Sequence, residues 1–206
     1  MNFDLITKNS TMQIHYDFFQ TGNTLFPQKG RILISEPFLM DNYFKRSIVL
    51  ITEHSDEGTV GFVLNKPINM KVNEIMNDFP KVNSIVSLGG PVQTNTLHYI
   101  HTMGDIIPGS VRIIDHIYWG GEFEVIKKLL ETGALNNENI RFFLGYSGWQ
   151  ASQLDDELSE NAWVVADIRP DEIMRPMNKI FWNKTLNRLG KKFQMWANFP
   201  ENPQMN

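Results

Sequence analysis

The chain has 206 residues, which suits one domain with a sizeable core, and its 42% hydrophobic and 20% charged residues exclude a disordered protein. Its formal net charge is -4, so the average surface repels nucleic acid and direct DNA binding is not expected. The chain contains no cysteine, which excludes disulfides, thiolate metal sites and cysteine nucleophiles and is typical of a reducing compartment.

Residues 1–29 are interpreted as an N-terminal arm, because they are polar and aromatic without a steady hydrophobic period. Residues 30–197 are expected to form a single domain, and the polar, proline-containing residues 198–206 a frayed tail. No apolar run approaches the roughly 20 residues of a membrane span, and no basic leader with an apolar core opens the chain. We therefore expect a cytoplasmic protein without membrane association.

The body is predicted to be rich in strands. Two β-branched runs, 47–53 and 59–64, flank the turn-like Ser55-Asp56-Glu57-Gly58 and predict a β-hairpin. Short apolar runs bounded by glycine, proline and polar residues predict six further strands, at 32–35, 84–88, 97–101, 109–114, 140–144 and 162–166.

Amphipathic spacing predicts four helices, at about 72–79, 123–130, 149–160 and 178–190. The third would join the strands 140–144 and 162–166 by a connection long enough for a parallel crossover. Because the strands outnumber the helices and are partly linked by hairpins, the fold class is α+β with a mixed sheet rather than a doubly wound array.

The segment Gly145-Tyr146-Ser147-Gly148-Trp149 admits two interpretations. An esterase nucleophile turn needs glycine two residues before and two residues after the serine, and Trp149 occupies the second position. Ser147 and Gln150 instead fit a capping box at the start of the predicted third helix. The cap is therefore favoured over the nucleophile, and backbone N–H groups at such a helix start could also hold an anion.

Other candidate residues lie at predicted strand ends. Glu53 and His54 are adjacent on one strand and would point to opposite faces. No pair of histidines has a local metal-binding spacing, so neither a metal nor a cofactor is expected. Gly89 and Gly90 allow close approach of the backbone to a ligand or to another strand, with a structural turn as the favoured interpretation. Lys66 lies at a strand end, where it could contact an anion.

These motifs and their order resemble the YqgE/AlgH family, bacterial proteins often labelled transcriptional regulators. The resemblance runs from about Gly30 to about Trp182 and rests on Gly30-Arg31-Ile32-Leu33-Ile34-Ser35-Glu36-Pro37, Asp41-x-x-Phe44-x-Arg46-Ser47, Glu53-His54, Gly58-x-x-Gly61-x-Val63-x-Asn65-x-Pro67, Gly89-Gly90-Pro91-Val92, and Gly145-Tyr146-Ser147-Gly148-Trp149 with Gln153-Leu154. Ser152 stands where members of that family usually carry glycine. The resemblance implies a bifurcated β-sheet curled into a pseudo-barrel with three to four flanking helices, and it implies no catalytic residues.

Three hypotheses about function follow. The first is a non-catalytic protein with a regulatory or small-ligand-binding role. Its site would lie where six residues of the strand ends and turns could converge, namely Glu53, His54, Gly89, Gly90, Ser147 and Gly148. The second is a hydrolase acting through Ser147 or through a water activated by His54. The third is a module that binds a protein partner through the aromatic arm, residues 12–26.

Overall fold

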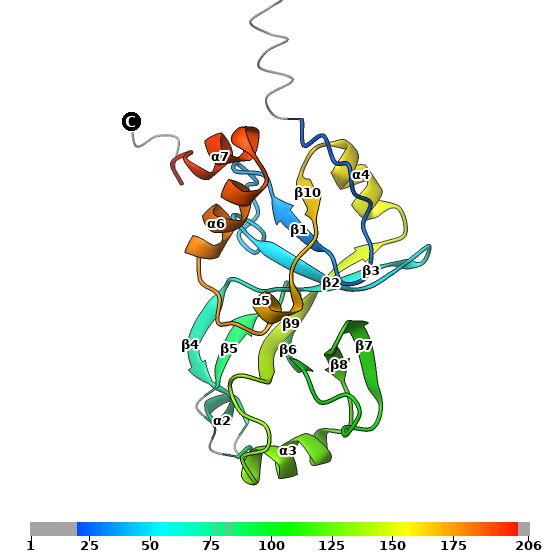
Figure 1. Ribbon diagram of the computed structural model, residues 1–206, viewed down its shortest axis with the longest axis vertical. Coiled ribbons are helices and arrows are strands. Elements are labelled where there is room, and N and C mark those ends of the chain that lie inside the picture. Colours follow the sequence, from blue (N-terminus) through cyan, green and yellow to red (C-terminus); the bar gives the residue numbers. More distant parts are fainter. Residues whose placement is uncertain (1–19, 77, 81, 83, 202–206) are drawn as a thin grey trace, which may run out of the picture.

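The computed structural model describes residues 20–201 except 77, 81 and 83 (Figure 1). Residues 1–19 of the expected arm, with the aromatic residues Tyr16, Phe18 and Phe19, therefore lie outside the described residues. The strands are β1 (Ile32–Ser35), β2 (Ile48–Ser55), β3 (Gly58–Val63), β4 (Pro67–Lys71), β5 (Ile85–Leu88), β6 (Val92–His101), β7 (Ser110–Ile114), β8 (Ile117–Gly120), β9 (Ile140–Gln150) and β10 (Trp163–Ala166). The helices are α2 (Val72–Ile75), α3 (Phe123–Glu131), α4 (Gln153–Ser159), α5 (Pro170–Ile173), α6 (Ile180–Arg188) and α7 (Lys191–Ala197).

The strands form one ten-stranded sheet that branches at β9. The main path runs β10-β1-β2-β3-β9-β6-β8-β7, and β4 and β5 leave this path with β5 paired to β9. The first half of β9 pairs with β5 in parallel, the second half pairs with β3 antiparallel, and β6 pairs with β9 antiparallel. The predicted α+β class with a bifurcated, curled sheet is therefore confirmed, and so is the β2–β3 hairpin.

Strand β9 connects two halves of the molecule (Figure 1). In that view β1, β2, β3 and β10 lie above with α4, α6 and α7, whereas β4 to β8 lie below with α2 and α3. Helix α5 lies between the halves. A core of each half forms where apolar faces meet: Trp182, Leu186 and Trp196 of α6 and α7 pack on the upper sheet, and Ile126 and Leu130 of α3 pack on the lower strands.

Strand β2 shows why the upper sheet needs helices on both faces. Its alternate residues Ile48 and Leu50 face α6 and α7, whereas Val49 and Ile51 pack in the cluster that contains Trp163. All four side chains are fully buried, so the continuous apolar run reflects a strand that is covered on both faces.

The structure departs from the sequence-based expectations in several elements. A helix occurs at each of the four expected places, but α5 and α7 are additional, and β4 and β8 were not expected. Strand β10 pairs with β1, so β9 and β10 are not neighbours. The four antiparallel pairs between them make β9 and β10 parallel, so the connection through α4 is a parallel crossover that passes over three strands.

Both ends of the described chain contact the domain. At the first end, Asn23 Nδ2 donates to the carbonyl of Trp163, 2.9 Å away, and its Oδ1 accepts the N–H of Val165 at 2.8 Å. At the other end, Phe199 lies in the segment expected to fray, yet its ring packs on that of Phe38 with 5.1 Å between centroids.

Candidate ligand-binding site

The chain passes over the backbone of β9 at Gly89 and Gly90. These residues connect β5, on one edge of β9, to β6, on the other edge. A Cβ atom added at Gly89 would lie 2.2 Å from the carbonyl oxygen of Gly145, and one added at Gly90 would lie 2.3 Å from the carbonyl carbon of Tyr146. We call this contact between Gly89-Gly90 and residues 145–147 the crossing. It requires glycine because the two backbones touch.

Ser147 takes part in the crossing and neither caps a helix nor sits on a nucleophile turn. It lies within β9, pairs with Gly61 and is completely buried. Its Oγ donates to the carbonyl of Gly89 at 3.0 Å. Both interpretations of this serine are therefore wrong, because pairing with β3 carries the strand on to Gln150.

The third helix begins later than the sequence suggested. The N-cap of α4 is Ser152, whose backbone is left-handed with φ 65. This conformation is costly for a residue with a side chain, which gives a physical reason for the glycine usual at this position in the family that the chain resembles.

Glu53 and His54 lie apart from the crossing, on the exposed end of β2. His54 borders a small groove of about 180 Å³ between the β2–β3 hairpin and the start of α4, and its Nδ1 is 2.7 Å from Oγ1 of Thr59. Glu53 and Gly148 both pair with Val60, from opposite sides of β3, so their backbones are about 10 Å apart. The structure thus brings Gly89, Gly90 and Ser147 together, but not with His54.

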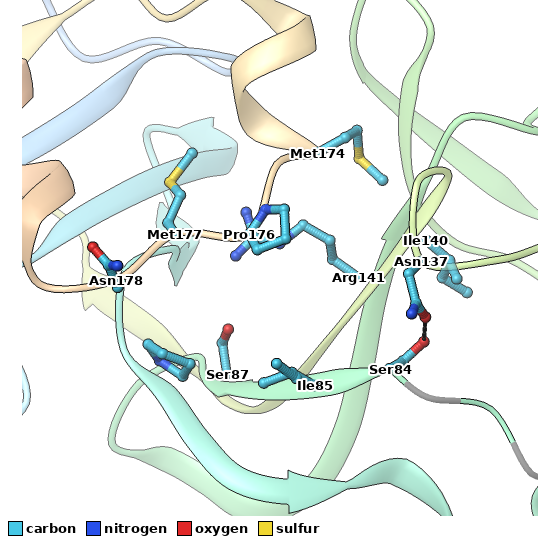
Figure 2. A pocket seen from close by; sticks show the side chains of 11 residues that line it. Ser84, Ile85, Ser87, Asn137, Ile140, Arg141, Met174, Pro176, Met177 and Asn178 are labelled. Carbon is cyan, nitrogen blue, oxygen red and sulfur yellow. Dashed lines mark hydrogen bonds between the residues drawn. The ribbon is translucent and has the colours of Figure 1, made fainter.

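A larger cavity of about 300 Å³ opens where the two halves meet (Figure 2). Its walls come from β5 and β9, from the turn before β9, and from the segment 174–178 between α5 and α6. The lining residues are Pro67, Ser84, Ile85, Ser87, Asn137, Ile140, Arg141, Met174, Pro176, Met177 and Asn178. We call it the Arg141 cavity.

Arg141 is the only charged residue among the described residues of this lining, and it is 8% exposed. Its guanidinium donates to the carbonyl of Ile173 at 2.5 Å and to the carbonyl of Leu64 at 2.8 Å. Its central carbon also lies 5.3 Å from the ring centroid of Phe143. These contacts tie the side chain of Arg141 to the upper half, where Leu64 follows β3, and to α5, which ends at Ile173.

The charge of Arg141 lacks a counter-ion in the part of the chain that the structure describes. Within residues 20–201, apart from the three undescribed positions, no carboxylate lies within 4.0 Å of this guanidinium. Burial lowers the pKa of Arg141 to about 10, so the side chain remains protonated at neutral pH. A buried charge without an opposite charge is unfavourable unless hydrogen bonds or a ligand compensate it.

The segment 174–178, which we call the strap, is placed over the cavity by local sequence. Pro176 disfavours helix at the preceding residue, so α5 ends and the chain crosses the cavity in an irregular conformation. Arg175 turns away and pairs with Asp171 at 2.8 Å, whereas Met174 and Met177 line the cavity. Asn178 accepts the N–H of Ile180 through Oδ1 at the start of α6.

Hydroxyl groups on the opposite wall differ in their bonding. Ser84 Oγ donates to Oδ1 of Asn137 at 2.5 Å. Ser87 Oγ points into the cavity in Figure 2 and has no hydrogen-bond partner among the described residues. Lys66 precedes the lining residue Pro67 but is not itself part of the lining; its Nζ donates to the carbonyl of Asn42 at 2.9 Å, and burial lowers its pKa to about 8. The wall therefore offers hydroxyl donors and the positive charge of Arg141.

Sequence reasoning did not single out Arg141, Ser87 or the strap. One signal was present: Arg141 interrupts the apolar run Ile140-Arg141-Phe142-Phe143-Leu144, where a charge is unexpected in a buried strand. Lys66 was noted, and it lies beside the cavity without lining it.

The described part of the chain lacks two other features, a metal-binding cluster and a membrane-spanning helix. Its histidines, aspartates and glutamates form no group of three or more that could hold a metal ion. None of its helices has the length and apolar character needed to cross a membrane.

Comparisons with known proteins give a consistent family. The sequence model of the AlgH-like family matches residues 32–194. A UPF0301 protein of Bacteroides thetaiotaomicron is 42% identical over 197 residues, covering 95% of this chain and 100% of the relative. A UPF0301 protein of Chlorobium chlorochromatii is 40% identical over 177 residues, covering 86% of this chain and 94% of the relative.

Two solved structures share the fold. A protein from Corynebacterium diphtheriae superimposes with a TM-score of 0.71 at 22% identity, covering 88% of this chain and 97% of the other. The AlgH protein from Pseudomonas aeruginosa superimposes with a TM-score of 0.67 at 24% identity, covering 86% of this chain and 98% of the other. At these identities the likeness establishes the fold alone.

Proposed function

The chain belongs to the AlgH-like family, and we propose that it binds a small molecule in the Arg141 cavity as a non-catalytic, regulatory protein of the cytoplasm. The observation that carries this proposal is the buried side chain of Arg141, which lines the cavity and whose guanidinium has no carboxylate partner among the described residues. A cavity of about 300 Å³ with mainly apolar walls and a few polar groups has the usual character of a small-molecule site.

The composition of the lining favours binding over catalysis. None of the eleven lining residues carries a carboxylate, imidazole, amine or phenol, so the wall holds no general base or acid. The serine proposed for a hydrolase, Ser147, is completely buried, and its hydroxyl donates to a carbonyl rather than to a base. His54 lies in a separate groove and contacts Thr59.

The position of the cavity suits regulation. Its walls include β5 of the lower half and the strap that leads to α6 of the upper half, and Arg141 of β9 bonds to a carbonyl of the upper half, that of Leu64, and to the last carbonyl of α5. A ligand that bridges β5 and the strap would stabilise the folded junction by mass action. The protein would sense the bound molecule through this gain in the stability of the junction.

Methyl spectra of the methionines test the proposal directly. We expect members of a small-molecule library to shift the signals of Met174 and Met177, which line the cavity, while exposed Met40 and Met195 stay unchanged. A Ser87→Leu variant fills the cavity and should abolish those shifts.

The matched control is Ser159→Leu, on the exposed side of α4, which should leave the shifts intact. A library that perturbs Met40 or Met195 but never Met174 or Met177 would refute the proposal. Equal responses of the Ser87→Leu variant and the wild type would do the same.

A further inference from the structure

We propose that the ligand of the Arg141 cavity is a small monocarboxylate with an apolar body. This inference rests on the proposed function and names the chemical class that the site accepts. It follows from the charge of the wall, the donors that remain unused, and the apolar surface around them.

The charge of the lining fixes the charge of the ligand. Arg141 supplies one positive charge, and no other described residue of the lining is ionised. A monoanion neutralises that charge, whereas a phosphate dianion would carry excess negative charge into a wall of methionine, isoleucine and proline. A planar carboxylate also matches the fork of a guanidinium, which can bind both of its oxygens.

The donors needed for a carboxylate are available. A guanidinium has five N–H groups, and two of those of Arg141 have protein acceptors, the carbonyls of Ile173 and Leu64. Ser87 contributes a hydroxyl without a partner in the described chain. The side-chain amide of Asn178 keeps its N–H groups, because only its oxygen is engaged, by the N–H of Ile180. These donors lie on β9, β5 and the strap, around one space (Figure 2).

The remainder of the wall suits hydrocarbon. Met174 and Met177 cover the space from the strap, and Ile85 and Ile140 line it from the strands. Methionine side chains adapt to irregular apolar ligands. At about 30 Å³ for each water-sized group, a cavity of about 300 Å³ holds about ten non-hydrogen atoms. Aromatic acids and short fatty acids have this size.

The first experiment compares three probes on the wild-type full chain, with calorimetry and the methionine methyl signals as readouts. Benzoate has the predicted chemistry, benzamide has the same shape without charge, and inorganic phosphate has charge without an apolar body. We expect benzoate to bind saturably at millimolar concentrations or below and to shift Met174 and Met177. Benzamide and phosphate should each bind at least tenfold more weakly.

The second experiment changes the protein. Arg141→Lys keeps the charge but removes the fork and should weaken benzoate binding at least tenfold, whereas Arg112→Lys, at an exposed arginine, should bind like the wild type. If Arg141→Lys does not fold, Ser87→Ala serves instead, since it removes one donor from the cavity without leaving a partner unpaired.

The outcomes separate this inference from the proposed function. Benzamide binding as tightly as benzoate, with shifts at Met174 and Met177, would overturn the carboxylate and leave small-molecule binding intact. Phosphate binding as tightly as benzoate would overturn the requirement for an apolar body. Absence of binding by all three probes would overturn the inference, and the library screen would then decide the proposed function separately.

Discussion

The crossing and the Arg141 cavity both lie along β9, but the chain packs tightly against this strand at the crossing and leaves space beside it at the cavity. At the crossing, the second half of β9 meets Gly89 and Gly90 so closely that backbone fills all the space. At the cavity, the first half of β9 carries a charged side chain into space that the protein leaves open. Gly89, Gly90 and Ser147 therefore mark a packing contact, whereas the proposed binding rests on Arg141, a charge without a carboxylate partner among the described residues.

The largest expected effect is on the crossing. In Gly89→Ala the new Cβ would lie 2.2 Å from the Gly145 oxygen, so the backbones must separate and lose the bond from Gly89 N–H to the Leu144 carbonyl. We expect a loss of about 4 kcal/mol or more in the free energy of unfolding, measured in urea. Gly148→Ala is the matched control, because its nearest contact is the ring of Tyr146 at 3.2 Å and its cost should be about 1 kcal/mol or less. Equal losses for both variants would contradict the steric account.

A smaller effect is expected for Ser147→Ala. The variant loses the bond to the Gly89 carbonyl, which keeps a second bond from the N–H of Val63 at 2.9 Å. The free energy of unfolding should fall by about 1 kcal/mol, and benzoate binding should not change. A Ser147→Ala protein that folds normally but no longer binds benzoate would place this serine in the site and break the distinction between the two regions.

Ser87→Ala should show the reverse pattern. Its hydroxyl has no partner in the described chain, so the free energy of unfolding should change by about 0.5 kcal/mol or less, while benzoate binding weakens about tenfold. Ser84→Ala is the control in the same wall, because its hydroxyl is already bound to Asn137 and contributes little to a ligand. Calorimetric titration of both variants would contradict the account if Ser84→Ala lost more affinity than Ser87→Ala.

The smallest expected effect is a pH dependence of the free energy of unfolding that comes from two histidines of β6 and not from Arg141. Burial lowers the pKa of His98 and of His101 on β6 below the ordinary value of 6.5, whereas Arg141 stays charged at neutral and mildly acidic pH. Below about pH 6.5 the unfolded chain therefore takes up protons more readily than the folded one, so the free energy of unfolding is highest above this pH and falls as the pH drops towards the folded pKa values.

The variant His98→Phe sharpens this prediction. The Nε2 atom of His98 is buried without a partner among the described residues, and the ring packs against Phe62 and Tyr146. Phenylalanine should therefore be tolerated and should reduce the slope of stability against pH. Urea unfolding of wild type and variant between about pH 5 and pH 8 measures both slopes, and identical slopes would show that His98 does not contribute.

The local sequence pattern predicted many of the strands and helices, but it did not predict which strands pair with one another. The β-branched runs predicted β1, β2 and β3 because these strands are buried and the hairpin turn is local. The pairing of β10 with β1 joins residues that are about 130 positions apart in sequence, which a local hydrophobic period does not record. Gly190 is the last residue of the predicted helix 178–190 and follows α6 in the structure, but it is also the N-cap of α7. The glycine that indicates the end of one helix gave no sign that another helix begins there.

The site was harder to predict for the same reason. Ser147 and Gln150 satisfy the local pattern of a capping box, but pairing with β3 holds both in a strand. Arg141 is visible in sequence only as a charge in an apolar run. What surrounds it is decided by the strap, more than thirty residues later, and by β5, more than fifty residues earlier.

A crystal structure of the full chain with 4-bromobenzoate tests the central claim most directly, since anomalous scattering from bromine locates the ligand independently of the protein. The account predicts a bromine peak inside the Arg141 cavity, beside Met174 or Met177, with the carboxylate within hydrogen-bonding distance of Arg141 and Ser87. A peak in the groove beside His54 or at the crossing, with the Arg141 cavity empty, would contradict it.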